Sequence, residues 1–151
     1  MDVEAKATVL ARFVRSLPPD FLQTQIDYQY NFHMGAMITD AILQAGFDWE
    51  RGVYPRAKQV QQQYPQARTT SGFLKVLEEE TAEKLIARWQ GTEKPRRLTA
   101  VTRFFVKVHV ETPEDLRRWL QTRENPRRLD QIRGIGPKTV DYLKMQVGIQ
   151  T

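Results

Sequence analysis

Apolar residues recur at helical spacing along most of this chain, and no segment of the sequence alternates with the period of two typical of a half-buried strand. Prolines and capping residues mark where each helix starts and stops. The sequence therefore predicts an all-α fold. The clearest apolar face predicts a buried central helix, with Gly46 after it as a cap. This face consists of Met34, Met37, Ile38, Ala41 and Ile42. Further helices are expected at about residues 3–17, 49–63, 71–79, 81–89, 95–110 and 113–121, the last with Thr112 as its N-cap candidate.

The composition excludes several classes of protein. The chain has 151 residues, no cysteine and two histidines, His33 and His109. Without cysteine there are no disulfides, zinc fingers, iron–sulfur clusters or catalytic thiols, and both histidines adjoin apolar runs, so we expect core-edge residues and no metal site. No apolar run approaches the ~18 residues of a membrane span. We expect a cytoplasmic protein with an N-terminal helical segment, residues 1–29, and one helical core domain, residues 30–151.

The charge is distributed unevenly. Residues 1–93 contain 10 Lys and Arg against 12 Asp and Glu, whereas residues 94–144 contain 13 against 6. A basic segment of this kind indicates a nucleic-acid partner, although a solvated basic face would have the same composition. Lys94, Arg96 and Arg97, at the start of a predicted helix, are candidate DNA contacts, and a solvated turn is the alternative.

The most specific local pattern lies at residues 126–147. A short helix, with Asn125 as its cap, is followed by a Gly-Ile-Gly turn, and Pro137 opens a second helix. The glycines permit a tight turn in which Ile135 is expected to fill the gap between the two helices. They also leave backbone N–H groups bare at a helix N-terminus, where a phosphate binds favourably. The alternative is an αα-hairpin that needs only the turn. The predicted phosphate contacts are Arg133, Gly134, Ile135, Gly136, Lys138 and Thr139.

Residues 129–143 resemble the helix-hairpin-helix motif of the base-excision DNA glycosylases related to endonuclease III. Weaker similarity in the same order covers residues 36–53, 91–105 and 112–120. The resemblance implies the six-helix core of that superfamily, with an additional N-terminal helix, and double-stranded DNA as the partner. In its bifunctional members a lysine at the position of Lys138 attacks the sugar, which makes Lys138 the candidate catalytic residue. We expect no cofactor other than a monovalent cation at the hairpin.

The chain departs from this family at the catalytic carboxylate. In active members the catalytic aspartate follows this lysine at a position that lies beyond Thr151, so it is absent from these 151 residues. That carboxylate normally stabilises the positive charge that develops on the sugar when the glycosidic bond breaks. Asp141 and Asp48 are the candidate substitutes, but an aspartate early in a helix more commonly complements the helix dipole. We therefore expect DNA binding with weak or no base excision.

Three hypotheses follow for the function. The chain is a DNA-binding protein that is inactive or weakly active as it stands, a truncated but genuine DNA glycosylase and abasic-site lyase, or a helical interaction module that binds no DNA. The resemblance implies that the N-terminal helix packs on segments beyond the hairpin. Without those segments, the apolar face of this helix would be exposed, covered by a second copy in a homo-oligomer, or folded back onto the core. The face consists of Val9, Leu10, Phe13, Val14 and Leu17.

Overall fold

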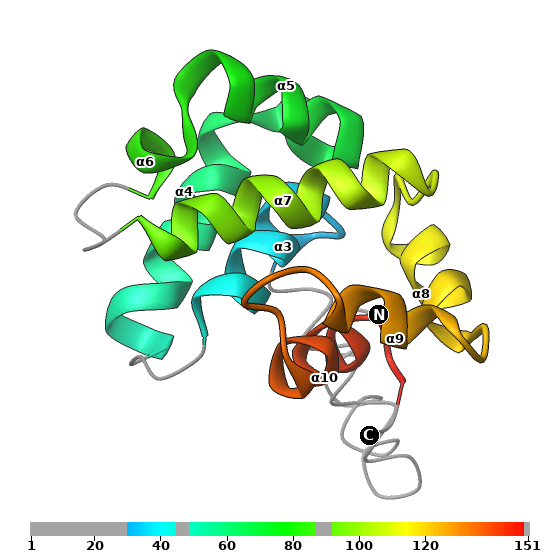
Figure 1. Cartoon of the computed structure of the whole chain (residues 1–151). Coiled ribbons are helices and arrows are strands. Elements are labelled where there is room, and N and C mark those ends of the chain that lie inside the picture. The colour runs from blue at the N-terminus through cyan, green and yellow to red at the C-terminus, as the bar shows by residue number, and fades with distance from the viewer. Residues whose placement is uncertain (1–29, 45–48, 87–91, 150–151) are drawn as a thin grey trace, which may run out of the picture.

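The computed structural model describes residues 30–44, 49–86 and 92–149. Every regular element in these ranges is helical and none is a strand, which confirms the all-α prediction (Figure 1). None of the helices in the described ranges has the length and apolar character of a membrane span. The N-terminal segment 1–29 with its predicted helix and the cap at Gly46 lie outside the described residues. The helix predicted at 81–89 is shorter than expected, since it ends at Leu85 and Ile86 is its C-cap.

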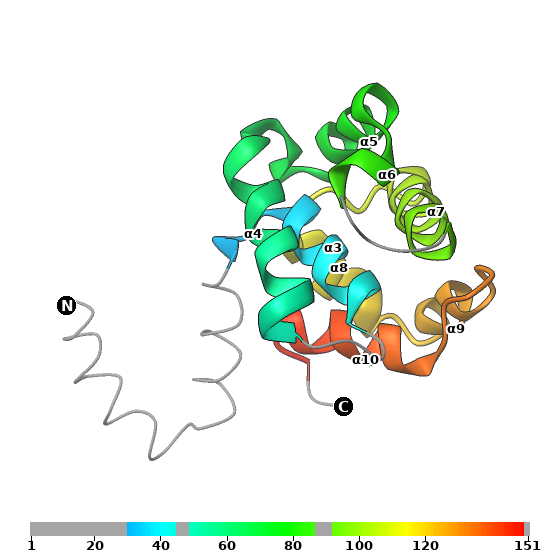
Figure 2. The same ribbon diagram turned by 90° about the vertical axis from the view of Figure 1, so that its left-hand side faces the viewer.

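Helix α3, Met34–Leu43, is the central helix that the sequence predicts. All ten of its residues are buried, including the polar Thr39 and Asp40. Helices α4 (Tyr54–Gln63), α7 (Glu93–Lys107) and α10 (Pro137–Gln146) contact it, and Figures 1 and 2 show it in the middle of the bundle. Burial on all sides explains why this segment is apolar around most of its circumference.

Two helix boundaries differ from the prediction for local reasons. The helix expected at 49–63 begins as a π-helical turn, η2 (Trp49–Val53), and continues as α4. Pro55 has no N–H to donate to a carbonyl four residues earlier, so it opens a new helix instead of continuing the old one. Helix α7 ends at Lys107 because His109 adopts a left-handed conformation, with φ 64°. The remaining elements are η3 (Pro65–Arg68), α5 (Thr70–Glu80), α6 (Ala82–Leu85), α8 (Pro113–Gln121) and α9 (Asn125–Asp130).

Helix α8 sets the position of the segment that follows it. Its N-terminus has the predicted cap: the Thr112 hydroxyl accepts from the Asp115 N–H at 3.1 Å, and the Asp115 carboxylate accepts from the Thr112 N–H at 3.2 Å. The Trp119 ring packs edge-on against Phe104 of α7, with the ring centroids 5.6 Å apart. The prediction of Asn125 as the cap of α9 is wrong, since its side-chain amide donates to the Trp119 carbonyl at 2.9 Å and the cap is Glu124.

The two histidines differ in environment. His33 is buried, as expected for a core-edge residue, and it caps α3: its Nδ1 accepts from the Ala36 N–H at 3.1 Å while its Nε2–H donates to the Tyr64 carbonyl at 2.8 Å. The prediction for His109 is wrong, because that side chain is exposed. Burial lowers the pKa of His33, and protonation of Nδ1 would remove the acceptor that caps α3.

The free energy of unfolding is expected to fall as the pH drops below neutrality because of His33. A folded-state pKa below the unfolded value of about 6.5 stabilises the fold above that pH, and the stabilisation is lost as the pH falls through the lower folded pKa. Urea unfolding across this range should show a flatter pH profile in His33→Asn, which keeps a capping side chain but cannot titrate. His109→Asn, at an exposed left-handed position that asparagine tolerates, should retain the wild-type profile. Parallel profiles for wild type and His33→Asn would show that His33 does not cause the pH dependence of the free energy of unfolding.

Candidate nucleic-acid interface

The hairpin predicted from sequence joins α9 to α10. Gly134 has φ +87°, a backbone conformation that favours glycine, and Gly136 is extended as the N-cap of α10. Between them Ile135 is only 5% exposed and fills the space between the helices, as the sequence predicts. The inward positions of the two helices are likewise buried and comprise Leu129, Val140, Leu143 and Val147.

The outer side of this hairpin is accessible at the start of α10. Gly136, which carries no side chain to cap the helix, borders open space: a Cβ built there would meet no atom within 4 Å. The first N–H groups of a helix have no partners within the helix, and their positive dipole end favours an anion. Lys138 is exposed in this first turn, whereas the predicted contact Thr139 is buried at 7% exposure. An anion approaching Gly136 therefore meets backbone donors and a lysine without steric obstruction.

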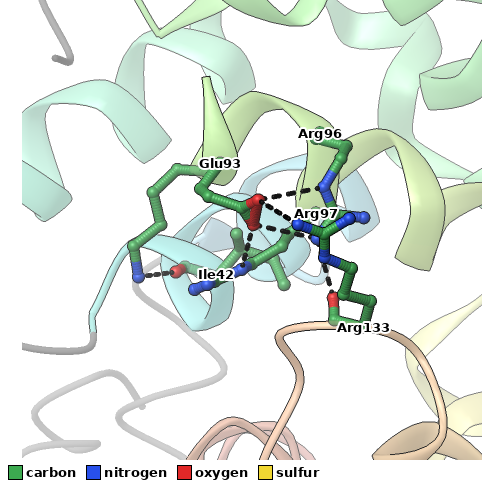
Figure 3. Close-up of polar contacts among 6 residues, drawn as sticks. Ile42, Glu93, Arg96, Arg97 and Arg133 are labelled. Carbon is green, nitrogen blue, oxygen red and sulfur yellow. Dashed lines mark hydrogen bonds and ion pairs between the residues drawn. The ribbon is translucent and has the colours of Figure 1, made fainter. Parts of the chain in front are cut away.

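Two of the three basic residues predicted at the start of α7 lie against this hairpin (Figure 3). The Glu93 carboxylate receives the Arg96 guanidinium at 2.9 Å and the Arg97 Nε–H at 3.2 Å. Arg133 of the hairpin turn reaches the same carboxylate at 3.8 Å. We call these four residues the Glu93 cluster. It combines three guanidinium groups with one carboxylate and is formally +2.

Contacts to the backbone also connect α7 to the hairpin. The Arg96 guanidinium donates to the Arg133 carbonyl at 2.9 Å. The Arg97 side chain covers Gly134 so closely that a Cβ there would lie 2.2 Å from the Arg97 Nε. The absence of a side chain at residue 134 thus serves both the turn and the packing of Arg97.

Lys94, the third predicted contact on α7, points elsewhere. Its ammonium donates to the Ile42 carbonyl at 2.9 Å, near the C-terminal end of α3 (Figure 3). Burial, and secondarily the charge of Arg97, lowers the pKa of Lys94. A cation at the C-terminal end of a helix stabilises the exposed carbonyls and the helix dipole there. The structure thus places the Lys94 ammonium at the C-terminal end of the central helix.

The candidate catalytic lysine lies on an open surface. Lys138 is exposed, and Asp141, one helical turn later, is partly exposed. Two surface hollows among the described residues, of about 620 and 420 Å³, are not lined by Lys138. The second candidate carboxylate, Asp48, lies outside the described residues. Lys138 is thus accessible to a group that approaches from solvent.

Sequence reasoning missed two acidic residues with many partners. Asp40, 2% exposed, accepts hydrogen bonds from the Tyr30 hydroxyl, the Gln44 amide and the Trp49 indole, the last at 2.9 Å. Burial, followed by the charge of Asp40, raises the pKa of Tyr30. The signal in the sequence was an acidic residue within the predicted buried helix, because a buried carboxylate requires hydrogen-bond donors. For Glu93 the signal was its spacing of three and four residues from two arginines on one helix.

Comparisons with protein-family models, curated proteins and solved structures found no significant match to this chain. Among the residues that the structure describes, no three histidine, aspartate or glutamate side chains converge as metal ligands would. The geometry and charge of the hairpin and the Glu93 cluster are therefore the basis for assigning a function.

The two hairpin glycines should respond differently to alanine. Gly134→Ala places a Cβ on a left-handed backbone and into Arg97, so we expect a loss of roughly 1–3 kcal/mol in the free energy of unfolding. Gly136→Ala enters open space on an extended backbone and loses only the N-cap preference of glycine over alanine, so its effect should stay below about 1 kcal/mol. Chemical denaturation measures both. Equal losses at the two positions would contradict the described turn.

Proposed function

We propose that this chain is a DNA-binding protein with the helical core of the helix-hairpin-helix DNA glycosylases, and that it binds duplex DNA through the hairpin at the start of α10. The open N-terminus of α10 at Gly136, beside the exposed Lys138, carries the proposal. Backbone N–H groups at such a terminus are ready donors to a phosphate oxygen, and the lysine adds a positive charge.

The surrounding charge supports a nucleic-acid partner over an interaction module that binds no DNA. The hairpin lies in the basic segment, 94–144, with its 13 Lys and Arg against 6 Asp and Glu. Charge of this kind contributes affinity by releasing counterions from the DNA, independently of base sequence. Contacts to phosphates position a duplex without reading its bases. We therefore propose binding of low sequence specificity, strongly weakened by salt.

The chemistry we propose is limited to an already damaged site. We propose weak or no base excision for a polypeptide of residues 1–151 alone, because the position of the family's downstream aspartate lies beyond Thr151. An abasic site needs no glycosidic cleavage, since its ring-opened sugar already presents an aldehyde at C1′. The Lys138 amine would add to that carbon and lose water to form an imine. Excision by a longer form of the chain is the alternative, and adding the residues that follow Thr151 would test it.

The first test is duplex binding by fluorescence anisotropy at increasing salt. Affinity should fall by a factor of at least ~10 between about 50 and 200 mM salt. Gly136→Glu and Lys138→Glu should weaken binding at low salt without lowering the thermal midpoint, because neither position packs in the core. The matched control is Lys75→Glu, an equal charge change on an exposed residue of α5, at the opposite end of the bundle from α10 (Figure 1). Equal affinity in all four proteins would remove the hairpin from the interface.

The second test is covalent trapping on DNA that contains an abasic site. Borohydride reduces an imine to a stable amine, so wild type should give a low yield of crosslinked protein, and Lys138→Gln should give none. Excision of damaged bases from intact duplexes should stay at background. Trapping that persists in Lys138→Gln would assign the attack to another amine, and efficient base excision would show that a different carboxylate replaces the family's aspartate.

A further inference from the structure

We propose that Glu93 acts as an internal phosphate mimic, occupying a second phosphate-binding position formed by Arg96, Arg97 and Arg133, from which a DNA phosphate displaces it. This inference rests on the proposed function, because it assigns a second phosphate of the same bound DNA to the Glu93 cluster. The cluster would then do two things. It would extend the interface from the hairpin to α7, and it would weaken binding in proportion to the strength with which Glu93 holds the arginines.

The chemistry of the cluster matches that of a phosphate site. Guanidinium groups pair with carboxylate and phosphate oxygens through the same planar arrangement of N–H donors. Both oxygens of Glu93 are used: Oε1 lies 2.9 Å from the Arg96 Nη2, and Oε2 lies 3.8 Å from the Arg133 Nη2. The hydrogen bond from Arg96 is the main cause that lowers the pKa of Glu93, which keeps the carboxylate anionic. One acid therefore stands where several cations converge.

The arginines have further contacts that do not involve Glu93. Arg96 also donates to the Arg133 carbonyl at 2.9 Å, and Arg97 lies directly over Gly134. A glutamine at residue 93 would therefore leave these two side chains near their present positions. A purely structural role predicts the opposite, because Glu93 would then be needed to place the arginines and its loss would weaken DNA binding.

The location of the cluster allows one strand to contact both sites. Arg133 and Gly134 belong to the turn that leads directly to Gly136 and the start of α10, so the Glu93 cluster and the hairpin share one surface. Every side chain of the cluster is partly solvent exposed, from 26% for Arg97 to 82% for Arg133. Displacement of Glu93 therefore needs a rotation of surface side chains and no opening of the core.

The test compares duplex affinity in Glu93→Gln and wild type, with Glu124→Gln as the matched control. Glu124 lies in the same basic region and forms a long ion pair with Arg127, at 4.0 Å, and its neutralisation changes the overall charge equally. We expect Glu93→Gln to bind about 3- to 10-fold more tightly at low salt and to steepen the salt dependence by roughly one phosphate contact. Glu124→Gln should gain clearly less. Adding Arg133→Gln to Glu93→Gln should remove most of the gain.

A second measurement observes the arginines without DNA. Inorganic pyrophosphate is titrated into nitrogen-15 labelled protein while the Nε–Hε resonances of Arg96 and Arg97 are followed by NMR. These resonances should shift at lower pyrophosphate concentration in Glu93→Gln than in wild type or Glu124→Gln. Thermal midpoints of the variants show that the fold is retained.

The outcomes separate this inference from the proposed function. Affinity in Glu93→Gln that is unchanged, lower, or raised only as much as in Glu124→Gln would overturn the inference, even if the hairpin variants weaken binding as proposed. If instead no protein binds duplex DNA, the proposed function falls and the pyrophosphate titration decides alone. Tighter pyrophosphate binding in Glu93→Gln would then support an internal anion at the cluster, and identical titrations would overturn it.

Discussion

Burial of α3 on all sides is the constraint on which the remaining structure depends. A helix without a solvent-exposed face must present apolar side chains around most of its circumference, and its polar groups need internal partners. Asp40 therefore requires the donors supplied by Tyr30, Gln44 and Trp49, and these come from segments before and after the helix. The two ends of α3 are satisfied from outside as well, by His33 at the N-terminus and by Lys94 near the C-terminus. The Lys94 contact attaches the start of α7 to the central helix.

The position of α7 in turn connects the core to the candidate interface. Lys94 is turned inward to α3, whereas Arg96 and Arg97 of the same segment are turned to the hairpin. On the other side, Trp119 packs on α7 and the Asn125 amide holds the turn after α8. The hairpin is thus fixed from two directions, and Ile135 packs between its helices. A rigid support matters for phosphate recognition, because prearranged donors lose little conformational entropy when they bind.

Under the proposed function, two features of the candidate interface have opposite electrostatic effects on a DNA strand. The terminus at Gly136, where an added Cβ would meet no atom within 4 Å, favours an anion through its backbone donors and the helix dipole. The arginines next to it are already paired with Glu93, so a phosphate must replace an existing ion pair there. Exposed ion pairs contribute little because water and salt screen them, which makes such a replacement feasible. Under the proposed function, this arrangement favours weak, rapidly reversible contact with a nucleic-acid backbone at the cluster and firmer contact at the hairpin.

The sequence by itself determined the helical class, the buried central helix, the cap at Thr112 and the hairpin with Ile135 inside it. These features depend on periodicity, on proline and glycine, and on hydrogen bonds between residues close in sequence, all of which are local. Tertiary structure alone decided that Lys94 donates to the Ile42 carbonyl and that Glu93 pairs with Arg133 of the distant hairpin turn. It also decided that Asp40 accepts hydrogen bonds from donors before and after α3. Such contacts depend on how helices dock. A charged side chain has the same local sequence whether it faces solvent, another helix or a buried carbonyl, and only packing selects among these partners.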